Sequence, residues 1–336
     1  LIVLIKYLIC FMITKERAAK RVTSTGEIKD TFLDDIKDLP EWVEIYKLNH
    51  WSPSQLNTME CLWGYKYLYL TQEQRRQLPI NSKMFTGVCL GEMGILTFGN
   101  FLWENKVGKG LVKSEIPPQR KIFDKVLEKF NLYEPVDEAD KAQHKVARLG
   151  LAKSFQTLKA GLREVNLTSP IECERSVALT LDGCVLPTIG RIDFEDKNNF
   201  VEMKTKHKKK NRPKKDGTSS YSLPKLDEGY LGWDEHISQV AFYYFANNEK
   251  KKPHLFVMNE EEYRIYTPQN CDDLKPENLK KHLNKLTITA KRRERILENH
   301  AGKTTWHQDI APDFNHFFWK NMGEHRDIAM KLWGLE

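Results

Sequence analysis

Residues 190–206, with the sequence GRIDFEDKNNFVEMKTK, place charged side chains at alternating positions on both sides of a polar stretch. A symmetric turn within that stretch, DKNN, predicts a β-hairpin. In this hairpin Asp193 lies opposite Glu202, and Arg191 lies opposite Lys204. We expect the other face to be buried, because it carries the apolar side chains Ile192, Phe194, Val201 and Met203.

The opposed carboxylates define the chemistry that this hairpin could support. Directly opposed side chains have Cβ atoms about 4.5–5.5 Å apart, and like charges so placed repel. Lys204 offsets part of that repulsion, and Mg²⁺ or Mn²⁺ could offset the rest, with positions left for water and a phosphate oxygen. Such a metal generates a nucleophile at neutral pH, and the lysine stabilises a charged transition state. The alternative is an amphipathic hairpin whose polar face simply meets solvent.

The sequence around the hairpin predicts helices first and then strands. Ser52, Pro53 and Gln55 form a capping box that begins a helix extending to residue 70. The other predicted helices are 84–104 (with Gly87, Gly91 and Gly94 along one side), 120–130, 140–164, 234–247 and 277–299. Predicted strands are 171–181, 184–194, 200–205, 254–258 and 262–267. This order indicates a mixed α/β fold with a mainly antiparallel sheet.

Four stretches occur in the order of the PD-(D/E)xK nuclease superfamily, and the sequence resembles its RecB-like branch with the phage and mitochondrial exonucleases. Residues 51–70, WSPSQLNTMECLWGYKYLYL, and residues 86–96, TGVCLGEMGIL, are similar to the branch's opening helix and its glycine-led acidic helix. Asp193 followed by Glu202-Met203-Lys204 is similar to the D…ExK core. Gln239-Val-Ala-Phe-Tyr243 is similar to the QxxxY helix. The resemblance covers more than half of the chain.

This resemblance implies a restriction-endonuclease-like core, flanked by helices and extended by helical N- and C-terminal additions. It also implies a metal site whose ligands are Glu92, Asp193, Glu202 and the backbone carbonyl of Met203. Many relatives carry a histidine four residues after the helix glycine, but Gly91 occupies that place here. The departure allows one metal ion or two.

The remaining matched residues have other implied roles. Lys204 would be catalytic together with Asp193 and Glu202. Gln239 and Tyr243 are one helical turn apart and would contact DNA or support the site.

The basic residues are concentrated beside this core. The chain has 53 Lys and Arg against 46 Asp and Glu, a formal net charge of +7, and eight of the basic residues lie between 204 and 215. We interpret residues 206–232 as a long loop that contacts DNA. The expected contacts are Lys206, Lys208, Lys209, Lys210, Arg212, Lys214 and Lys215. The basic helix at 277–299 could extend this patch or simply face solvent.

The termini and the cysteines add further expectations. The six cysteines show no zinc or iron–sulfur spacing, so we expect no cluster. Residues 1–13 form an apolar run too short to span a bilayer, and we expect residues 1–11 not to be native because Met12 follows. We divide the chain into an N-terminal extension (1–50), a nuclease domain (51–270) and a C-terminal helical extension (271–336).

Together these features predict a metal-dependent deoxyribonuclease, an exonuclease acting on linear or single-stranded DNA in phage or bacterial recombination or genome processing. We expect Mg²⁺ or Mn²⁺ as cofactor, DNA ends or single strands as partner, no membrane, and the cytoplasm of a bacterium or phage-infected host. A single-strand annealing protein would be a suitable recombination partner. The alternatives are an endonuclease of the same fold and a non-catalytic DNA-binding accessory protein, although the latter would require a broken D…ExK core.

Overall fold

The computed structural model describes residues 39–99, 119–168, 171–212, 220–227, 232, 234–316, 318–319 and 322–335. Residues 1–11 and most of the predicted N-terminal extension lie outside these residues, as do Lys214 and Lys215 of the basic segment. Within the described residues, no helix combines the length and the apolar character that crossing a membrane requires.

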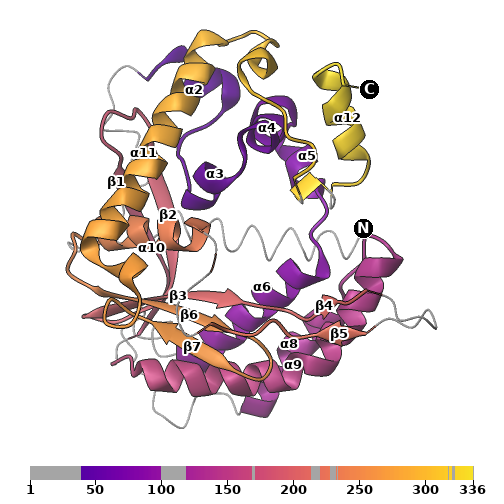
Figure 1. Cartoon of the computed structure of the whole chain (residues 1–336), viewed down its shortest axis with the longest axis vertical. Helices are drawn as coiled ribbons and strands as arrows, with labels where there is room; N and C mark the ends of the chain where they lie inside the picture. The colour runs from indigo at the N-terminus through magenta and orange to yellow at the C-terminus, as the bar shows by residue number, and fades with distance from the viewer. Residues whose placement is uncertain are drawn as a thin grey trace.

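A five-stranded mixed sheet forms the centre of the fold (Figure 1). Its strands follow the spatial order β1 (Glu172–Thr180), β2 (Pro187–Glu195), β3 (Asn199–Thr205), β6 (Lys252–Met258) and β7 (Tyr263–Tyr266). All neighbours are antiparallel except β3 and β6, which are parallel and are connected through α10 (Asp234–Ala246). The predicted mixed α/β class is confirmed, and this arrangement is consistent with a restriction-endonuclease-like core.

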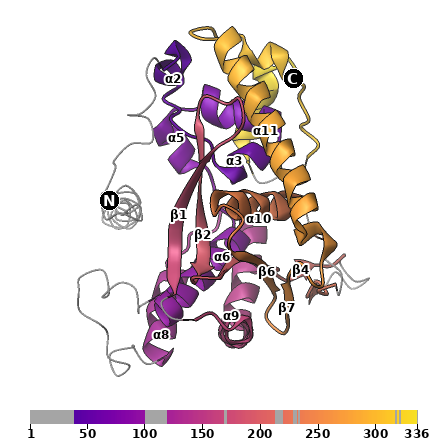
Figure 2. The same cartoon turned by 90° about the vertical axis from the view of Figure 1, so that its left-hand side faces the viewer.

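Helices cover both faces of the sheet, and Figure 2 shows α10 and α9 on opposite sides of β6. On one face, α6 (Ser82–Gly94), α8 (Gln119–Asn131) and α9 (Glu138–Val165) enclose a cluster that includes Phe130, Leu158, Phe194, Val201 and Phe256. On the other face, α10 and α11 (Pro276–Asn299) enclose a cluster that includes Phe200, Val240, Leu255 and Leu286. These clusters fix β2, β3 and β6 between two layers of helices.

One prediction about the hairpin core needs correction. Ile192 is buried, as expected, but it packs in the cluster with Phe200 and not in the cluster with Phe194. The reason is that β2 pairs with β3 only at Phe194 and Glu195. The rest of β2 continues as a twisted ribbon with β1, which Figure 2 shows extending away from the sheet.

The predicted opening helix is divided in the structure. The capping box at Ser52 is confirmed, but the helix ends at Asn57 because Thr58 is extended, with a ψ of 135°. At this break the buried Arg293 donates hydrogen bonds to the carbonyls of Gln55 and Thr58, at 2.5 Å each. The predicted single helix is thus three elements in the structure: α3 (Pro53–Asn57), α4 (Glu60–Gly64) and the π-helix η1 (Tyr65–Tyr69).

The second predicted helix, 84–104, begins at Ser82 and passes into the π-helix η2 (Ile95–Gly99). The predicted residues beyond Gly99 lie outside the described residues. The other elements are α2 (Glu41–Tyr46), α5 (Gln72–Gln77), η4 (Asp272–Leu274), η5 (Trp306–Asp309) and α12 (Glu324–Leu332).

The segment from residue 271 onward packs against the start of the described chain. Trp51 Nε1 donates a 3.0 Å hydrogen bond to Glu294 of α11, and the same carboxylate accepts from the backbone of Val185 and Leu186. The Tyr65 hydroxyl lies 2.8 Å from His325 Nδ1. The predicted domain boundaries stay predictions, but these contacts place α11 in the same hydrophobic cluster as α3 and α10.

The basic segment contains secondary structure that its sequence did not predict. Lys209–Lys210 (β4) pairs with Tyr221–Ser222 (β5) as a two-stranded antiparallel sheet. Two residues per strand are too few to show a periodicity of two, so the pairing depends on tertiary context. The interpretation of 206–232 as one long loop is therefore wrong for this part.

Candidate active site

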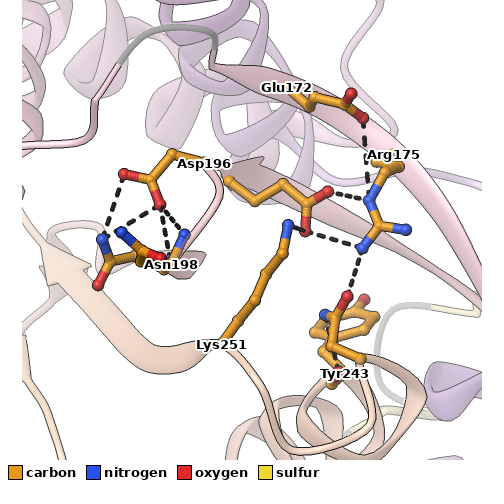
Figure 3. Close-up of polar contacts among 9 residues, drawn as sticks. Glu172, Arg175, Asp196, Asn198, Tyr243 and Lys251 are labelled. Carbon is orange, nitrogen blue, oxygen red and sulfur yellow. Dashed lines mark hydrogen bonds and ion pairs between the residues drawn. The ribbon is translucent and has the colours of Figure 1, made fainter. Parts of the chain in front are cut away.

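The closed end of the β2–β3 hairpin is fixed by Asp196. Its Oδ1 accepts hydrogen bonds from the backbone N–H groups of Asn198 and Asn199 at 2.8 and 2.6 Å, and its Oδ2 accepts from the N–H of Thr168 at 2.8 Å. Figure 3 shows the carboxylate directed into this turn. Burial alone would raise the pKa of Asp196, but the hydrogen bonds outweigh it and lower the pKa to about 2.

A buried ion cluster beside this turn connects the hairpin to its neighbours (Figure 3). Glu195 is 1% exposed and pairs with Arg175 of β1 and, at 2.9 Å, with Lys251 before β6. Arg175 also donates to the side chain of Asn247, which follows α10. These contacts hold together β1, β2 and the connection between α10 and β6. They lie at the closed end of the β2–β3 hairpin.

Strands β2 and β3 separate just beyond the pair of Phe194 and Val201, where Asp193 and Glu202 lie. The observed ladder pairs Phe194 with Val201 and Glu195 with Phe200, which is the predicted register. At the next position the Asp193 Oδ2 atom accepts a 2.6 Å hydrogen bond from the backbone N–H of Met203. The carboxylate therefore takes the place of a ladder partner on this side of β3. The N–H and C=O of one strand residue point to the same edge, so the Met203 carbonyl also points toward β2.

Glu202, Lys204 and Gln239 form a connected group over this opening. Lys204 Nζ donates to Glu202 Oε1 and to Gln239 Oε1, both at 2.5 Å. Glu202 is 4% exposed, whereas the Lys204 side chain is 21% exposed. The structure thus brings the predicted lysine, one acidic residue and the glutamine of α10 into direct contact.

Tyr243 lies one turn beyond Gln239 and packs against the same part of the sheet. A Cβ at Gly190 would lie 2.6 Å from its ring, so glycine is needed there for the close approach. Burial and the nearby carboxylates of Glu202 and Asp193 raise its pKa well above the usual value. The phenol therefore stays neutral beside the carboxylates of Glu202 and Asp193.

The charges of the group perturb one another. Burial, followed by the negative charge of Glu202, raises the pKa of Asp193 well above its usual value. Burial lowers the pKa of Lys204, but the attraction of Glu202 and Asp193 outweighs this effect, and the pKa is raised overall. The lysine is therefore a fixed cation, and the Asp193 carboxylate is the group that competes for a proton.

The same residues fit a divalent metal ion. Glu202 Oε2 is buried and has no hydrogen-bond partner among the described residues, so a buried anionic oxygen is left for a ligand. Asp193 and the Met203 carbonyl lie at the same opening. The described residues contain no group of three His, Cys, Asp or Glu side chains placed to hold a metal, so a site here would combine two carboxylates with backbone and solvent oxygens.

Glu92 is not brought to this group by any described contact. Its carboxylate pairs with Lys129 of α8 at 2.5 Å. Its neighbour Gly91 faces the side chain of Met203, which points to the opposite side of β3 from Glu202 and Lys204. A metal-binding role for Glu92 stays a prediction that rests on the resemblance.

The described basic residues follow β3 directly. Lys208 pairs with Glu260, while Lys209, Lys210 and Arg212 are exposed. Lys83, at the start of α6, is close enough to Lys209 for the two charges to repel. This cluster lies next to the strand that carries Glu202 and Lys204.

The site also contains an acidic residue that the sequence reasoning missed. Glu174 of β1 lies between Cys173 and Arg175, which pair with Phe194 and Ile192, so it faces Asp193 across the strands. Its charge contributes to the raised pKa of Asp193. The predicted strands 171–181 and 184–194 would have placed Glu172 opposite Asp193, because the observed pairing of Thr180 with Pro187 shifts the register by two residues.

No protein-family model and no curated protein matches the chain. Among solved structures, a "Putative exonuclease" from Eubacterium rectale is similar at 12% identity and a TM-score of 0.43, covering 79% of this chain and 87% of that chain. The structure of SSO0001 is similar at 14% identity and a TM-score of 0.24, covering 52% and 86%. Likenesses at these values carry no argument about function, which must come from the site itself.

Proposed function

We propose that the chain is a metal-dependent deoxyribonuclease that hydrolyses phosphodiester bonds from the ends of linear or single-stranded DNA. The observation that supports it most is the group of Asp193, Glu202 and Lys204, in which the buried Glu202 has an unpartnered carboxylate oxygen. A buried anionic oxygen without a partner costs free energy, and a site that binds a cation offsets that cost. The sequence resemblance to RecB-like nucleases supports the same assignment.

The proposed ligands of Mg²⁺ or Mn²⁺ are Asp193, Glu202 and the Met203 carbonyl, with Glu92 as a further candidate. When bound, the ion supplies Lewis acidity to the scissile phosphate and neutralises part of its charge. No iron–sulfur cluster is proposed.

The protein groups have separate tasks in this proposal. The Met203 N–H fixes the Asp193 carboxylate, and Gln239 holds Lys204 beside Glu202. The ammonium of Lys204 orients the attacking water and stabilises negative charge on the phosphate in the transition state. Tyr243 supports the site, and Gln239 also borders the path of the DNA. The basic residues after β3, including Lys206, bind the phosphate backbone.

The biological setting is proposed from the resemblance alone. It is recombination or genome processing in a bacterial or phage-infected cytoplasm, with a single-strand annealing protein as a suitable partner. An endonuclease or a non-catalytic DNA-binding protein of the same fold is the alternative.

Digestion of four matched DNA substrates tests the function. End-labelled linear duplex, its closed circular form, a linear single strand and a circular single strand are incubated with Mg²⁺, Mn²⁺ or EDTA. The proposal predicts that the linear forms are consumed with a metal and survive in EDTA, while the closed circles resist. Cleavage of closed circles as fast as linear DNA favours the endonuclease. Binding without any cleavage favours the accessory protein.

A further inference from the structure

Helix α6 carries two exposed apolar side chains near the end of β3. Met84 is 60% exposed and Val88 is 55% exposed, and because they are four residues apart they lie on one face of the helix. A Cβ at Gly87 would lie 3.2 Å from Thr205 Oγ1, so this part of α6 lies against the end of β3. Contiguous exposed apolar side chains, unlike isolated ones, indicate an interaction surface.

Two lysines border these apolar side chains. Lys83 precedes Met84 at the start of α6, and burial, followed by the charge of Lys209 of β4, lowers its pKa. The charge of Lys83 also reaches His207, whose Nε2 atom is 3.0 Å from Thr205 Oγ1. Lys83 and Lys209 thus lie together where the chain leaves β3.

The two ammonium groups carry positive charge that the described residues around them do not neutralise. Neither Lys83 nor Lys209 forms an ion pair with another residue in the ranges that the structure describes. Asp140, whose charge also reaches Lys83, accepts hydrogen bonds from the N–H of Ser82 and the hydroxyl of Tyr133. Because the two lysines come from separate elements, α6 and β4, the fold itself holds this positive charge in place for an anion.

The same helix continues toward the acidic group. Gly91 lies one turn beyond Gly87, and a Cβ there would lie 3.9 Å from Met203 Cε. Met203 lies between Glu202 and Lys204 in β3. Helix α6 therefore follows β3 from the two lysines back to the residues of the candidate active site.

A single strand of DNA combines the two kinds of group that this surface suits. Its phosphates are anionic, and its unpaired bases have apolar faces, whereas a duplex keeps the faces of its bases stacked inside. Met84 and Val88 are one helical turn apart, a rise of about 6 Å, whereas stacked bases in one strand are about 3.4 Å apart. The two side chains therefore suit neighbouring bases that no longer stack on each other.

We propose that this face of α6 binds single-stranded DNA next to the candidate active site. Met84 and Val88 contact the bases, and Lys83 and Lys209 bind the phosphates. The inference rests on the proposed function. Because the methionine side chain is flexible and polarisable, it adapts to any base, and the contacts are independent of sequence.

Two oligonucleotides of equal length, one normal and one made of abasic residues, test the base contacts. Fluorescence anisotropy in EDTA measures their binding at several salt concentrations. The double variant Met84→Ala/Val88→Ala should weaken binding of the normal oligonucleotide about fivefold to tenfold and binding of the abasic one by less than about twofold. A blunt duplex of the same length should also lose less than about twofold.

The phosphate contact is tested in the same titrations. Lys83→Gln should weaken binding of the normal and the abasic oligonucleotide alike and reduce the salt slope for each by about 0.7. Lys83→Arg keeps the charge and should keep the slope.

A matched control removes an apolar side chain elsewhere. Ile288 of α11 is 67% exposed, and Ile288→Ala should leave the affinity for both oligonucleotides unchanged. Since Met84 and Val88 are exposed, their double variant should unfold at the temperature of the wild type, which separates a lost contact from a lost fold.

Several results would overturn the inference. Equal losses on the normal and abasic oligonucleotides would show that Met84 and Val88 do not contact bases. An equal loss on the duplex would exclude a site for single strands, and an equal loss in Ile288→Ala would exclude a specific surface. An unchanged salt slope in Lys83→Gln would exclude the phosphate contact. Wild-type protein that binds no DNA would overturn the proposed function as well, whereas wild-type binding without cleavage in Mn²⁺ would overturn the proposed function alone.

Discussion

In the proposed metal site, Asp193 is the residue at which proton binding and metal binding would compete. Burial and the charge of Glu202 raise its pKa well above the usual value, so the free protein retains a proton there at a higher pH than an ordinary aspartate. A metal ion must displace that proton, because only the carboxylate coordinates. Lys204 does not relieve the competition fully, since its ammonium is already bonded to Glu202.

The first prediction is that Mn²⁺ binding releases protons at the pH where Asp193 is still protonated. Affinity should rise with pH through the raised pKa of Asp193 and level off above it. Calorimetry in buffers of different ionisation enthalpy measures the proton number directly. Asp193→Asn should remove both the proton release and most of the affinity. The same proton release in Asp193→Asn and the wild type would show that another group is responsible.

At the scale of the hairpin, the turn is a separate stabilising unit. The pKa of Asp196 is lowered to about 2, so its ionised form stabilises the folded state at any pH above its ordinary value of 3.8. That contribution is lost as the pH falls from 3.8 toward 2.

Asp196→Ala should lower the free energy of unfolding by about 2–3 kcal/mol at pH 7. The difference from the wild type should shrink on acidification through the same pH range. Urea unfolding at several pH values, followed by circular dichroism, measures both. A difference that is as large at pH 2 as at pH 7 would contradict the assignment to the ionised carboxylate.

Two glycines of α6 give matched predictions of opposite sign. A Cβ at Gly94 would lie 2.6 Å from the buried ring of Phe194, so Gly94→Ala should destabilise the protein by about 1–3 kcal/mol. A Cβ at Gly91 would lie 3.9 Å from Met203, an ordinary contact. Gly91→Ala should therefore stabilise the helix by about 0.5–1 kcal/mol. Chemical denaturation distinguishes the two, and equal effects would mean that α6 packs differently.

The elements that the sequence predicted are those determined by local chemistry. The capping box at Ser52 and the register of Phe194 with Val201 depend on residues close in the chain, and both were predicted. Glu174 escaped notice because neither its left-handed backbone nor its approach to Asp193 follows from a periodic pattern. The break in the opening helix depends on Arg293, more than 230 residues away, which no local signal identifies.

On the scale of the whole molecule, exposed positive charge adjoins the acidic group. Lys209, Lys210 and Arg212 are exposed, whereas Lys208 is occupied by Glu260. The basic helix α11 offers a second candidate path for DNA through Lys280, Lys281 and Arg295, which are also exposed. The two surfaces can be compared because each can lose three charges without altering the core.

Replacing Lys209, Lys210 and Arg212 with Gln should reduce the slope of log K against log salt for single-stranded DNA by about 2, because each lost contact contributes about 0.7. The matched triple replacement of Lys280, Lys281 and Arg295 should leave the slope within error of the wild type. Anisotropy titrations with a labelled oligonucleotide measure both. The reverse outcome would move the DNA path to α11.

The central claim is that Glu202 belongs to a metal-dependent hydrolytic site. Single-turnover cleavage of end-labelled linear duplex in Mn²⁺ tests it with the wild type, Glu202→Gln and, as a matched control, Glu261→Gln at an exposed glutamate. The account predicts that the wild type and Glu261→Gln cleave and that EDTA stops both. Glu202→Gln should be slower by at least about 10²–10³-fold while unfolding at the same temperature or higher. Cleavage by Glu202→Gln within about tenfold of the wild type, or cleavage that persists in EDTA, would contradict the claim.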